Sequence, residues 1–218
     1  MHVPTLFKKA LITFSGRLYL SDTVRNAAYR WAWDHISELP TGASVVDIGS
    51  RDSLFPAFLS WRRYFVRSIE RDSRFSLRQQ LNCRHWNVSY VIDNCDFLAA
   101  TIPGKCDAIC SLFSLQHSGD DDIYAYRSAA RQLRDGGMFL SATEYRHTGT
   151  RFHFERDDGT MRIYGPEDID GRLEKPLFDE GMAEYDRVYL GISENGKKVF
   201  TVTDPAQASY IFLLFKKN

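Results

Sequence analysis

Two acidic side chains, Asp47 and Glu70, stand where buried strands are expected to end. Asp47 closes the apolar run 44–46 and precedes Gly49, and Glu70 closes the next apolar run along the chain. In an open parallel sheet, ligands bind beyond the carboxyl ends of the strands, where the strand order reverses. A carboxylate at such an end accepts both hydroxyls of a ribose, so this pair indicates a cofactor that contains a nucleoside.

The elements that must position these acids alternate between strands and helices. Short apolar runs bounded by turn residues predict strands at 44–49, 64–69, 88–92, 108–112, 138–143, 185–192, 199–203 and 210–215. Helical spacing of apolar residues predicts helices at 21–39, 54–59, 120–134 and 166–173, and a second short one near 178–182. Strand–helix units closed by antiparallel strands make an open, doubly wound α/β sheet.

The stretch 145–165 interrupts this alternation. Residues 151–155 and 160–164 flank the turn 157–159 like the two arms of a hairpin. We interpret the stretch as a lid-like insertion that closes over a bound ligand and is mobile without one.

One domain over residues 1–218 is expected, with residues 1–42 as an N-terminal helical cap, because the chain contains no repeat, low-complexity tract or linker. The 28 Lys and Arg residues balance the 28 Asp and Glu residues, so no global charge favours nucleic acid as a partner. No apolar run approaches the roughly 18 residues of a transmembrane helix, and no secretory signal is visible, so a cytoplasmic location is expected. Nothing in the sequence indicates an oligomeric state.

Three consecutive aspartates, Asp120 to Asp122, raise the question of a metal site. A solvated helix start explains them better, because acids stabilise the positive end of a helix and Arg131 and Arg134 stand at the other end. No cluster of His, Cys and carboxylates has metal-ligand spacing, so no metal is expected.

Several segments together carry a family resemblance. They are Val45-Val-Asp-Ile-Gly-Ser50, Glu70, Asp96-Phe97, the stretch from Cys106 to His117, and residues 133–141. In order and spacing they resemble the motifs of the class I, Rossmann-like S-adenosylmethionine-dependent methyltransferases of the small-molecule type, over about residues 45–144. The resemblance implies a seven-stranded, mostly parallel sheet with helices on both faces. Its last strand, 210–215, would insert antiparallel between the fifth and the sixth and close an antiparallel edge.

The resemblance also implies S-adenosylmethionine as the cofactor. Glu70 is similar to the family's ribose-binding acid, and Asp96-Phe97 matches the acidic and apolar pair that holds adenine. The residues implied to contact the cofactor are Asp47, Gly49, Ser50, Arg51, Glu70, Arg71, Asp96, Phe97, Ser111 and Leu112.

The implied reaction transfers a methyl group from a sulfonium by in-line displacement. We expect a small molecule or a glycan or lipid precursor as the acceptor, methylated at oxygen, and a base must then remove the hydroxyl proton. His117, just past the fourth strand, is the candidate catalytic base, and His147 and His153 in the insertion are the alternatives.

The first motif departs from the family, which usually continues with two more glycines where this chain reads Gly49-Ser50-Arg51-Asp52-Ser53. Without those glycines the turn is expected to be narrower or differently shaped. In one reading the loop still binds, and Arg51 pairs with the carboxylate of the cofactor.

In the other reading the loop has lost the cofactor, and Arg51 is a structural partner of Asp52 or Glu70. The chain is then a catalytically inert binding or scaffolding domain. Retained binding is favoured, because Glu70 and Asp96-Phe97 have no reason to stand together in an empty crevice. A nucleotide-dependent oxidoreductase is disfavoured, because the chain lacks the Gly-x-Gly-x-x-Gly turn that positions a pyrophosphate.

Overall fold

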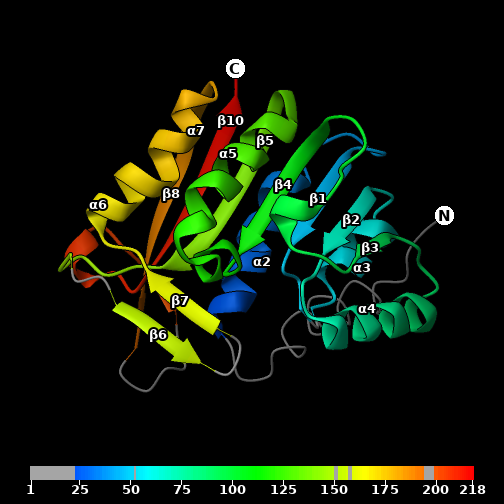
Figure 1. Cartoon of the computed structure of the whole chain (residues 1–218), viewed down its shortest axis with the longest axis horizontal. Coiled ribbons are helices and arrows are strands. Elements are labelled where there is room, and N and C mark those ends of the chain that lie inside the picture. Colours follow the sequence, from blue (N-terminus) through cyan, green and yellow to red (C-terminus); the bar gives the residue numbers. More distant parts are fainter. Residues whose placement is uncertain (1–22, 52, 150–151, 157–158, 194–198) are drawn as a thin grey trace.

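A mixed sheet of eight strands forms the centre of the protein, in the order β3-β2-β1-β4-β5-β10-β8-β9 (Figure 1). The computed structural model describes residues 23–51, 53–149, 152–156, 159–193 and 199–218. The strands of this sheet are β1 (Ser44–Ile48), β2 (Phe65–Ile69), β3 (Val91–Asp93), β4 (Cys106–Leu112), β5 (Leu133–Glu144), β8 (Met182–Ile192), β9 (Val199–Val202) and β10 (Tyr210–Lys217). Strands β1 to β5 pair in parallel, and the remaining pairs are antiparallel.

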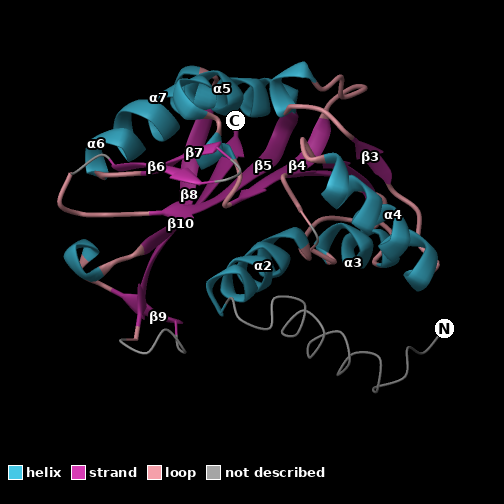
Figure 2. Cartoon of the chain, turned by 60° about the horizontal axis from the view of Figure 1, so that its bottom comes forward, coloured by secondary structure: helices cyan, strands magenta, loops and turns pink. Residues whose placement is uncertain are grey.

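Helices cover both faces of this sheet, as the sequence predicts (Figure 2). One face carries α2 (Thr23–Ile36), α3 (Phe55–Trp61) and α4 (Ser73–Trp86), and the other carries α5 (Asp122–Gln132), α6 (Pro166–Asp168) and α7 (Lys175–Asp179). Neighbouring strand residues divide between the two faces, because side chains alternate along a strand. Val45 and Leu214 belong to one apolar cluster, whereas Val46 and Leu213 belong to the other.

The C-terminal strand β10 lies between β5 and β8 and runs antiparallel to both. Leu213 pairs with Ser141 of β5 and with Arg187 of β8. Residues 211–215 are all buried, as in a strand covered on both faces. The predicted insertion of the last strand is thus confirmed. The sheet has eight strands rather than seven, because β9 adds to β8 at the edge.

Helix α4 is absent from the sequence prediction. Only Ser76 and Gln79 of its residues are buried, so no apolar stripe marks it. Its ends are well defined, because the Asp72 carboxylate accepts a hydrogen bond from the Arg74 N–H at 2.9 Å and Asn87 closes the helix in the left-handed conformation. Capping rather than periodicity therefore identifies this helix.

The short helix predicted near residues 178–182 is wrong. Helix α6 continues through a π-helical segment, Ile169–Glu174, directly into α7, and Met182 already begins β8. No helix in the described part of the chain is long and apolar enough to cross a membrane.

The insertion contains the predicted hairpin, formed by β6 (Phe152–Arg156) and β7 (Gly159–Ile163), on the side to which the parallel strands point (Figure 1). Its second arm is buried, since Met161, Arg162 and Tyr164 are at most 3% exposed. The Tyr164 N–H also donates to the Glu144 carbonyl at the end of β5, at 3.1 Å. Opening the insertion as a whole would expose these buried side chains, and its mobility as a lid stays a prediction.

Candidate cofactor site

A cavity of about 680 Å³ opens beyond the carboxyl ends of β1 to β4. Four segments supply its wall, one after each strand, and they lie within residues 48–51, 69–75, 95–97 and 113–119. This volume is in the range of small-molecule sites. The cavity is therefore at the sheet edge where the sequence places a ligand.

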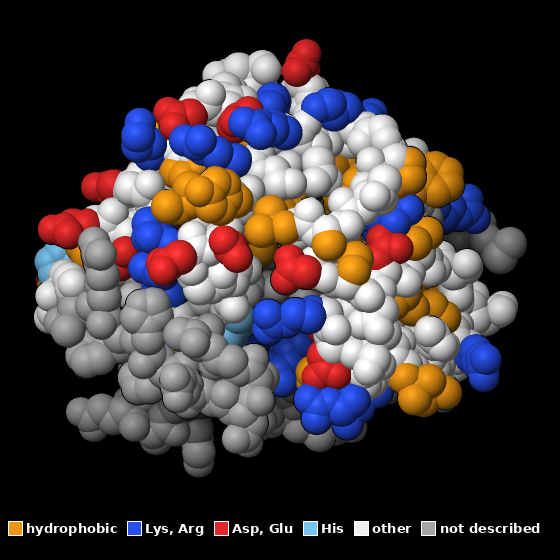
Figure 3. All heavy atoms as spheres, in the orientation of Figure 1, with side chains coloured by type: hydrophobic (Ala, Val, Ile, Leu, Met, Phe, Trp, Pro, Cys, Tyr) orange, Lys and Arg blue, Asp and Glu red, His pale blue; other side chains and the backbone are white. Residues whose placement is uncertain are grey.

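The wall of the cavity carries both signs of charge. Its basic side chains are Arg51, Arg71 and Arg74, and its carboxylates are Glu70, Asp72 and Asp96. In the space-filling view, Lys and Arg side chains gather at the lower centre of the molecule beside acidic ones (Figure 3). This balance suits a ligand that itself carries both positive and negative groups.

The structure brings most of the predicted site residues together. Those that line the cavity are Gly49, Arg51, Glu70, Arg71, Asp96, Phe97 and His117. The others, Asp47, Ser50, Ser111 and Leu112, are buried beneath the wall. The Ser111 hydroxyl oxygen accepts a hydrogen bond from the Leu115 N–H at 3.2 Å and so holds the loop after β4 from below.

Gly49 makes the turn after β1 possible. Its φ is +69°, in the left-handed region, and its N–H donates to the Ile69 carbonyl at 2.8 Å. A Cβ at this position would lie 2.0 Å from Ser114 Oγ and 2.6 Å from Ser114 Cβ. The turn therefore requires glycine both for its backbone conformation and for its contact with the loop after β4.

The turn keeps a glycine-type backbone although Arg51 occupies a glycine position of the family. Arg51 has φ +53°, which is uncommon for a residue with a side chain. Its N–H donates to the Glu70 carboxylate at 2.8 Å, and the Gln79 amide donates to its carbonyl at 3.0 Å. These two hydrogen bonds hold Arg51 in the left-handed conformation, and a narrower or differently shaped turn stays a prediction.

The two residues that replace glycines have their own contacts. The Arg51 guanidinium carbon lies 4.7 Å from the centroid of the Phe75 ring, on α4. The Ser53 hydroxyl oxygen accepts a hydrogen bond at 2.9 Å from the N–H of Phe55, the first residue of α3. Pairing of Arg51 with a cofactor carboxylate stays a prediction, and Asp52 lies outside the described residues.

Glu70 is held firmly at the end of β2. It is 5% exposed, and its two oxygens accept hydrogen bonds from the backbone N–H groups of Arg51, at 2.8 Å, and Asp72, at 3.0 Å. Each carboxylate oxygen has two lone pairs, so each can accept a further hydrogen bond from a ligand. The carboxylate is thus held in one orientation at the cavity wall and keeps acceptor capacity on both oxygens.

Asp96 and Phe97 place an acid beside an apolar surface. Asp96 caps the short 3₁₀ turn Phe97–Ala99 by accepting a hydrogen bond from the Leu98 N–H at 2.9 Å. Phe97 is 4% exposed and belongs to the core, yet it reaches the cavity wall.

His117 lies in the cavity wall, half-buried, in the 3₁₀ turn Leu115–His117 after β4. The alternatives stand elsewhere. His147 is exposed and outside the wall, with its Nδ1 3.3 Å from the Tyr145 hydroxyl, and the side chain of His153 lies outside the described part of the chain. Among the described imidazoles that the sequence singles out, His117 is the one that the structure brings to the cavity.

Two aromatic wall residues were missed from the sequence. Phe75 belongs to α4, which has no periodic signal. Phe113 has φ +63° and packs its ring against Tyr210 and Phe212 of β10, with ring centroids 5.8 and 6.3 Å away. Strained residues concentrate at functional sites, and this one is fixed by a strand that is distant in the sequence.

The aspartates before α5 form a solvated helix start only in part, because Asp120 and Asp121 are exposed as expected whereas Asp122 is buried. The Asp120 side chain is 90% exposed, but that of Asp122 is fully buried and accepts a hydrogen bond from Arg172 at 2.6 Å. The partner comes from a segment 50 residues away, so the local sequence carries no sign of it. No group of three or more His, Cys, Asp or Glu residues in the described ranges is placed to hold a metal ion.

Asp47 lies in a buried hydrogen-bond chain under the turn. It is 1% exposed and accepts a hydrogen bond from the Ser50 hydroxyl at 2.6 Å, and Ser50 is 2.8 Å from the Ser68 hydroxyl. Burial raises the pKa of Asp47 to about 7; the Ser50 hydrogen bond opposes this rise and the charge of Glu70 adds to it. Ionisation of Asp47 therefore lowers the stability of the folded protein at and above neutral pH.

Replacing Asp47 by asparagine is expected to stabilise the protein above pH 7. The pKa of Asp47 is raised from 3.8 when unfolded to about 7 when folded, so its contribution to stability falls as the pH rises between these values. A pKa shift of one unit corresponds to about 1.4 kcal/mol of stability, and relaxation of the protein around the charge reduces the total effect. We therefore expect Asp47→Asn to raise the free energy of unfolding by about 1–3 kcal/mol at pH 8 and to leave it unchanged at pH 3.5. Urea denaturation at both pH values checks this, and equal stability at pH 8 would contradict the raised pKa.

Neither a scan against protein-family models nor a search of curated proteins finds a match for this chain. Solved structures do match. An S-adenosylmethionine-dependent methyltransferase from Clostridium acetobutylicum has a TM-score of 0.68 and 14% identity, over 97% of this chain and 99% of that one. The Burkholderia thailandensis 1,6-didemethyltoxoflavin-N1-methyltransferase, solved with 1,6-didemethyltoxoflavin and S-adenosylhomocysteine, has a TM-score of 0.68 and 12% identity, over 100% of this chain and 92% of that one.

A third match shows how far such likeness reaches. The [4+2]-cyclase SpnF has a TM-score of 0.66 and 17% identity, over 88% of this chain and 82% of that one. Different activities thus occur among the matched structures, and function must be argued from the site. The cavity at the strand ends, the antiparallel β10 and these matches agree on one conclusion: the chain has the class I S-adenosylmethionine-dependent methyltransferase fold.

Proposed function

We propose that this protein transfers a methyl group from S-adenosylmethionine to a hydroxyl of a small molecule. The observation that carries the proposal is the pairing of Glu70 with the turn Gly49–Arg51, whose backbone holds the carboxylate at the cavity. A nucleoside site needs both the carboxylate and the turn. The carboxylate accepts hydrogen bonds from the ribose hydroxyls, and a glycine in the turn lets the ligand approach the backbone closely. The left-handed φ of Arg51 supports a working loop over an inert one.

The wall residues fit S-adenosylmethionine. Glu70 would accept the ribose hydroxyls, Phe97 offers an apolar surface to adenine, and Asp96 offers an acceptor to its amino group. The balanced charges of the wall suit the amino acid part of this cofactor, which carries an ammonium and a carboxylate. When bound, S-adenosylmethionine supplies an electrophilic methyl group on a sulfonium.

His117 is the base in this proposal. A hydroxyl acceptor must lose its proton as its oxygen is methylated, and an imidazole accepts a proton near neutral pH. His117 stands in the cavity wall, on the loop after β4.

A small molecule is favoured over a glycan or lipid precursor as the acceptor. The cavity, about 680 Å³, must hold both the cofactor and the acceptor, which leaves room for a compact molecule. The Burkholderia thailandensis structure, which shares the fold, holds a small heterocycle beside S-adenosylhomocysteine. The equal numbers of basic and acidic residues in the chain also argue against a nucleic-acid acceptor.

Isothermal titration of the protein with S-adenosylmethionine and S-adenosylhomocysteine tests the proposal. Glu70→Ala is expected to weaken S-adenosylhomocysteine binding at least about tenfold, because each hydrogen bond from a hydroxyl to the carboxylate contributes about 1.5–3 kcal/mol. Glu184→Ala is the matched control, since this glutamate lies on β8, paired with Arg187 and outside the cavity wall.

Melting temperatures must accompany these titrations, because Glu70→Ala also removes the acceptor of two backbone N–H groups. Unchanged affinity in a folded Glu70→Ala variant would remove Glu70 from the site. Absence of heat with both ligands at high concentration would overturn the proposal in favour of an inert binding or scaffolding domain.

A further inference from the structure

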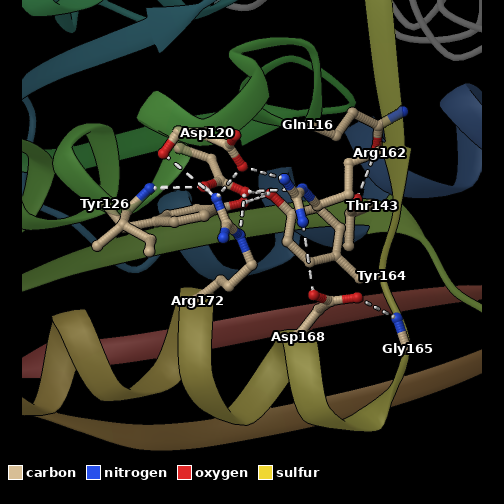
Figure 4. Close-up of polar contacts among 11 residues, drawn as sticks. Gln116, Asp120, Tyr126, Thr143, Arg162, Tyr164, Gly165, Asp168 and Arg172 are labelled. Carbon is tan, nitrogen blue, oxygen red and sulfur yellow. Dashed lines mark hydrogen bonds and ion pairs between the residues drawn. The ribbon is translucent and has the colours of Figure 1, made fainter. Parts of the chain in front are cut away.

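Five charged residues join the insertion to the start of α5, and we call them the arginine clamp. They are Arg162 on β7, Arg172 in the π-helical segment, Asp120 and Asp122 at the start of α5, and Asp168 on α6 (Figure 4). Figure 4 shows Arg162 reaching into this group of charges from the hairpin and Arg172 reaching into it from the helix below. The two guanidinium groups share Asp120 as a partner.

Arg172 and Tyr164 bind the buried carboxylate of the clamp. Arg172 donates to Asp122 through Nη2, at 2.6 Å, and through Nε, at 3.2 Å. The Tyr164 hydroxyl donates to the same carboxylate at 2.8 Å. Burial raises the pKa of Tyr164 well above its usual range, so this hydroxyl keeps its proton and remains a donor.

Arg162 connects the remaining acids. Its side chain is 3% exposed, and its nitrogens lie 2.7 Å from Asp120, 3.4 Å from Asp122 and 3.6 Å from Asp168. Arg172 Nη2 also lies 3.2 Å from Asp120. Arg162 of the insertion and Arg172 of the π-helical segment therefore both hold Asp120, although its own side chain is 90% exposed.

The loop that ends at Asp120 is held locally by hydrogen bonds of its backbone rather than by side-chain caps. Its two 3₁₀ turns, Leu115–His117 and Gly119–Asp121, and the start of α5 have no side-chain cap. One end of the loop is tied to β5, because Gln116 Oε1 accepts a hydrogen bond from the Thr143 hydroxyl at 2.6 Å. The clamp ties the other end. Between these two attachments lie His117, Ser118 and Gly119, which line the cavity.

We propose that Arg162 and Arg172 are positioning residues that fix the cavity wall formed by His117, Ser118 and Gly119. The proposal rests on the proposed function, since it assigns this wall to the cofactor and acceptor. A buried ion pair contributes little to the net stability of the fold, because desolvation of the charges offsets their attraction. Its hydrogen bonds are directional, however, and so favour one arrangement of the segments that they join. Gly119, with φ +61°, gives the loop a flexible joint directly before the residue that the clamp holds.

The insertion thus acts as a brace for this wall. Its hairpin arm β7 packs against both 3₁₀ turns of the wall and carries Arg162 into the clamp. A change in the clamp should therefore be felt at His117 and at a bound cofactor, although no member of the clamp lines the cavity.

The test uses Arg172→Gln, with S-adenosylhomocysteine as the probe. Arg131→Gln is the control, because Arg131 also makes an ion pair from α5, with Glu180 at 2.6 Å, but on the exposed surface. Two signals are measured: the affinity for S-adenosylhomocysteine by calorimetry, and the ¹H–¹³C ring signal of His117, assigned with His117→Gln. We expect Arg172→Gln to lower the affinity about fivefold or more and to shift the His117 signal, and Arg131→Gln to change neither.

Arg172→Lys should restore part of the affinity, because it keeps the charge but loses the forked geometry. If Arg172→Gln does not fold, Asp120→Asn provides the same measurements, since this exposed residue is a partner of both arginines. Wild-type affinity together with an unmoved His117 signal in a folded variant would overturn the positioning role. If wild-type protein does not bind S-adenosylhomocysteine, the proposed function fails, and the His117 signal alone decides whether the clamp positions the wall.

Discussion

Replacing Arg162 by methionine is expected to lower the free energy of unfolding by about 3–5 kcal/mol, because removal of one partner leaves buried charge uncompensated. The Arg162 side chain is 3% exposed, and the carboxylates around it include Asp122, fully buried, and Asp168, 2% exposed. Methionine fills similar volume but brings no positive charge to balance these two carboxylates. Urea denaturation at pH 7 measures the loss.

Arg131→Met is the control for this experiment. Arg131 is 64% exposed in its ion pair with Glu180, and exposed pairs contribute about 0–1 kcal/mol. A loss below 1 kcal/mol in Arg162→Met, similar to that of the control, would show that the clamp is not a buried, interdependent unit. Such a result would also remove the physical basis for the brace.

Gly49→Ala is expected to abolish measurable cofactor binding, weakening it by about a hundredfold or more, and to destabilise the fold. The new Cβ would lie 2.0 Å from Ser114 Oγ and 2.6 Å from Ser114 Cβ, so the turn or the loop after β4 must move. A left-handed φ of +69° costs alanine a further 1–2 kcal/mol or so. Displacement of either segment deforms the cavity wall, and small misplacements at a site have large effects.

The double variant Gly49→Ala/Ser114→Gly separates the two causes. Without the Ser114 side chain, the closest remaining contact of the new Cβ is the Ser114 Cα at 3.7 Å, an ordinary distance. Binding of S-adenosylhomocysteine should then recover only in part, because the left-handed φ at position 49 still disfavours alanine. Wild-type affinity in Gly49→Ala alone would show that the turn is not part of the cofactor site.

The strand ends were predictable because their signals are local. Val45 and Val46 mark a strand buried on both faces, and the acids Asp47 and Glu70 follow buried runs directly, so residue type and position alone locate the sheet edge. The apolar run 211–215 likewise predicts a fully covered strand. The hairpin was also predictable, because turn residues stand between its two arms.

Other features were decided by the tertiary structure. Arg51 has a left-handed backbone because Glu70 and Gln79 hold it at both sides, so a missing glycine does not reveal the shape of the turn. Helix α4 supplies Phe75 to the wall without an apolar stripe, because it lies mostly exposed on the sheet.

The clearest division is at Asp122, which looks like a solvated helix acid in the sequence and is fully buried in the fold. Its burial is possible because Arg162 of the insertion and Arg172 of the π-helical segment supply the positive charge that balances its carboxylate. The sequence by itself determined where the strands end and which acid lines the cavity at the end of β2. Only the folding of the insertion onto α5 decided which charges pair and what holds His117 at the cavity, because long-range ion pairs have no periodicity that a sequence pattern can display.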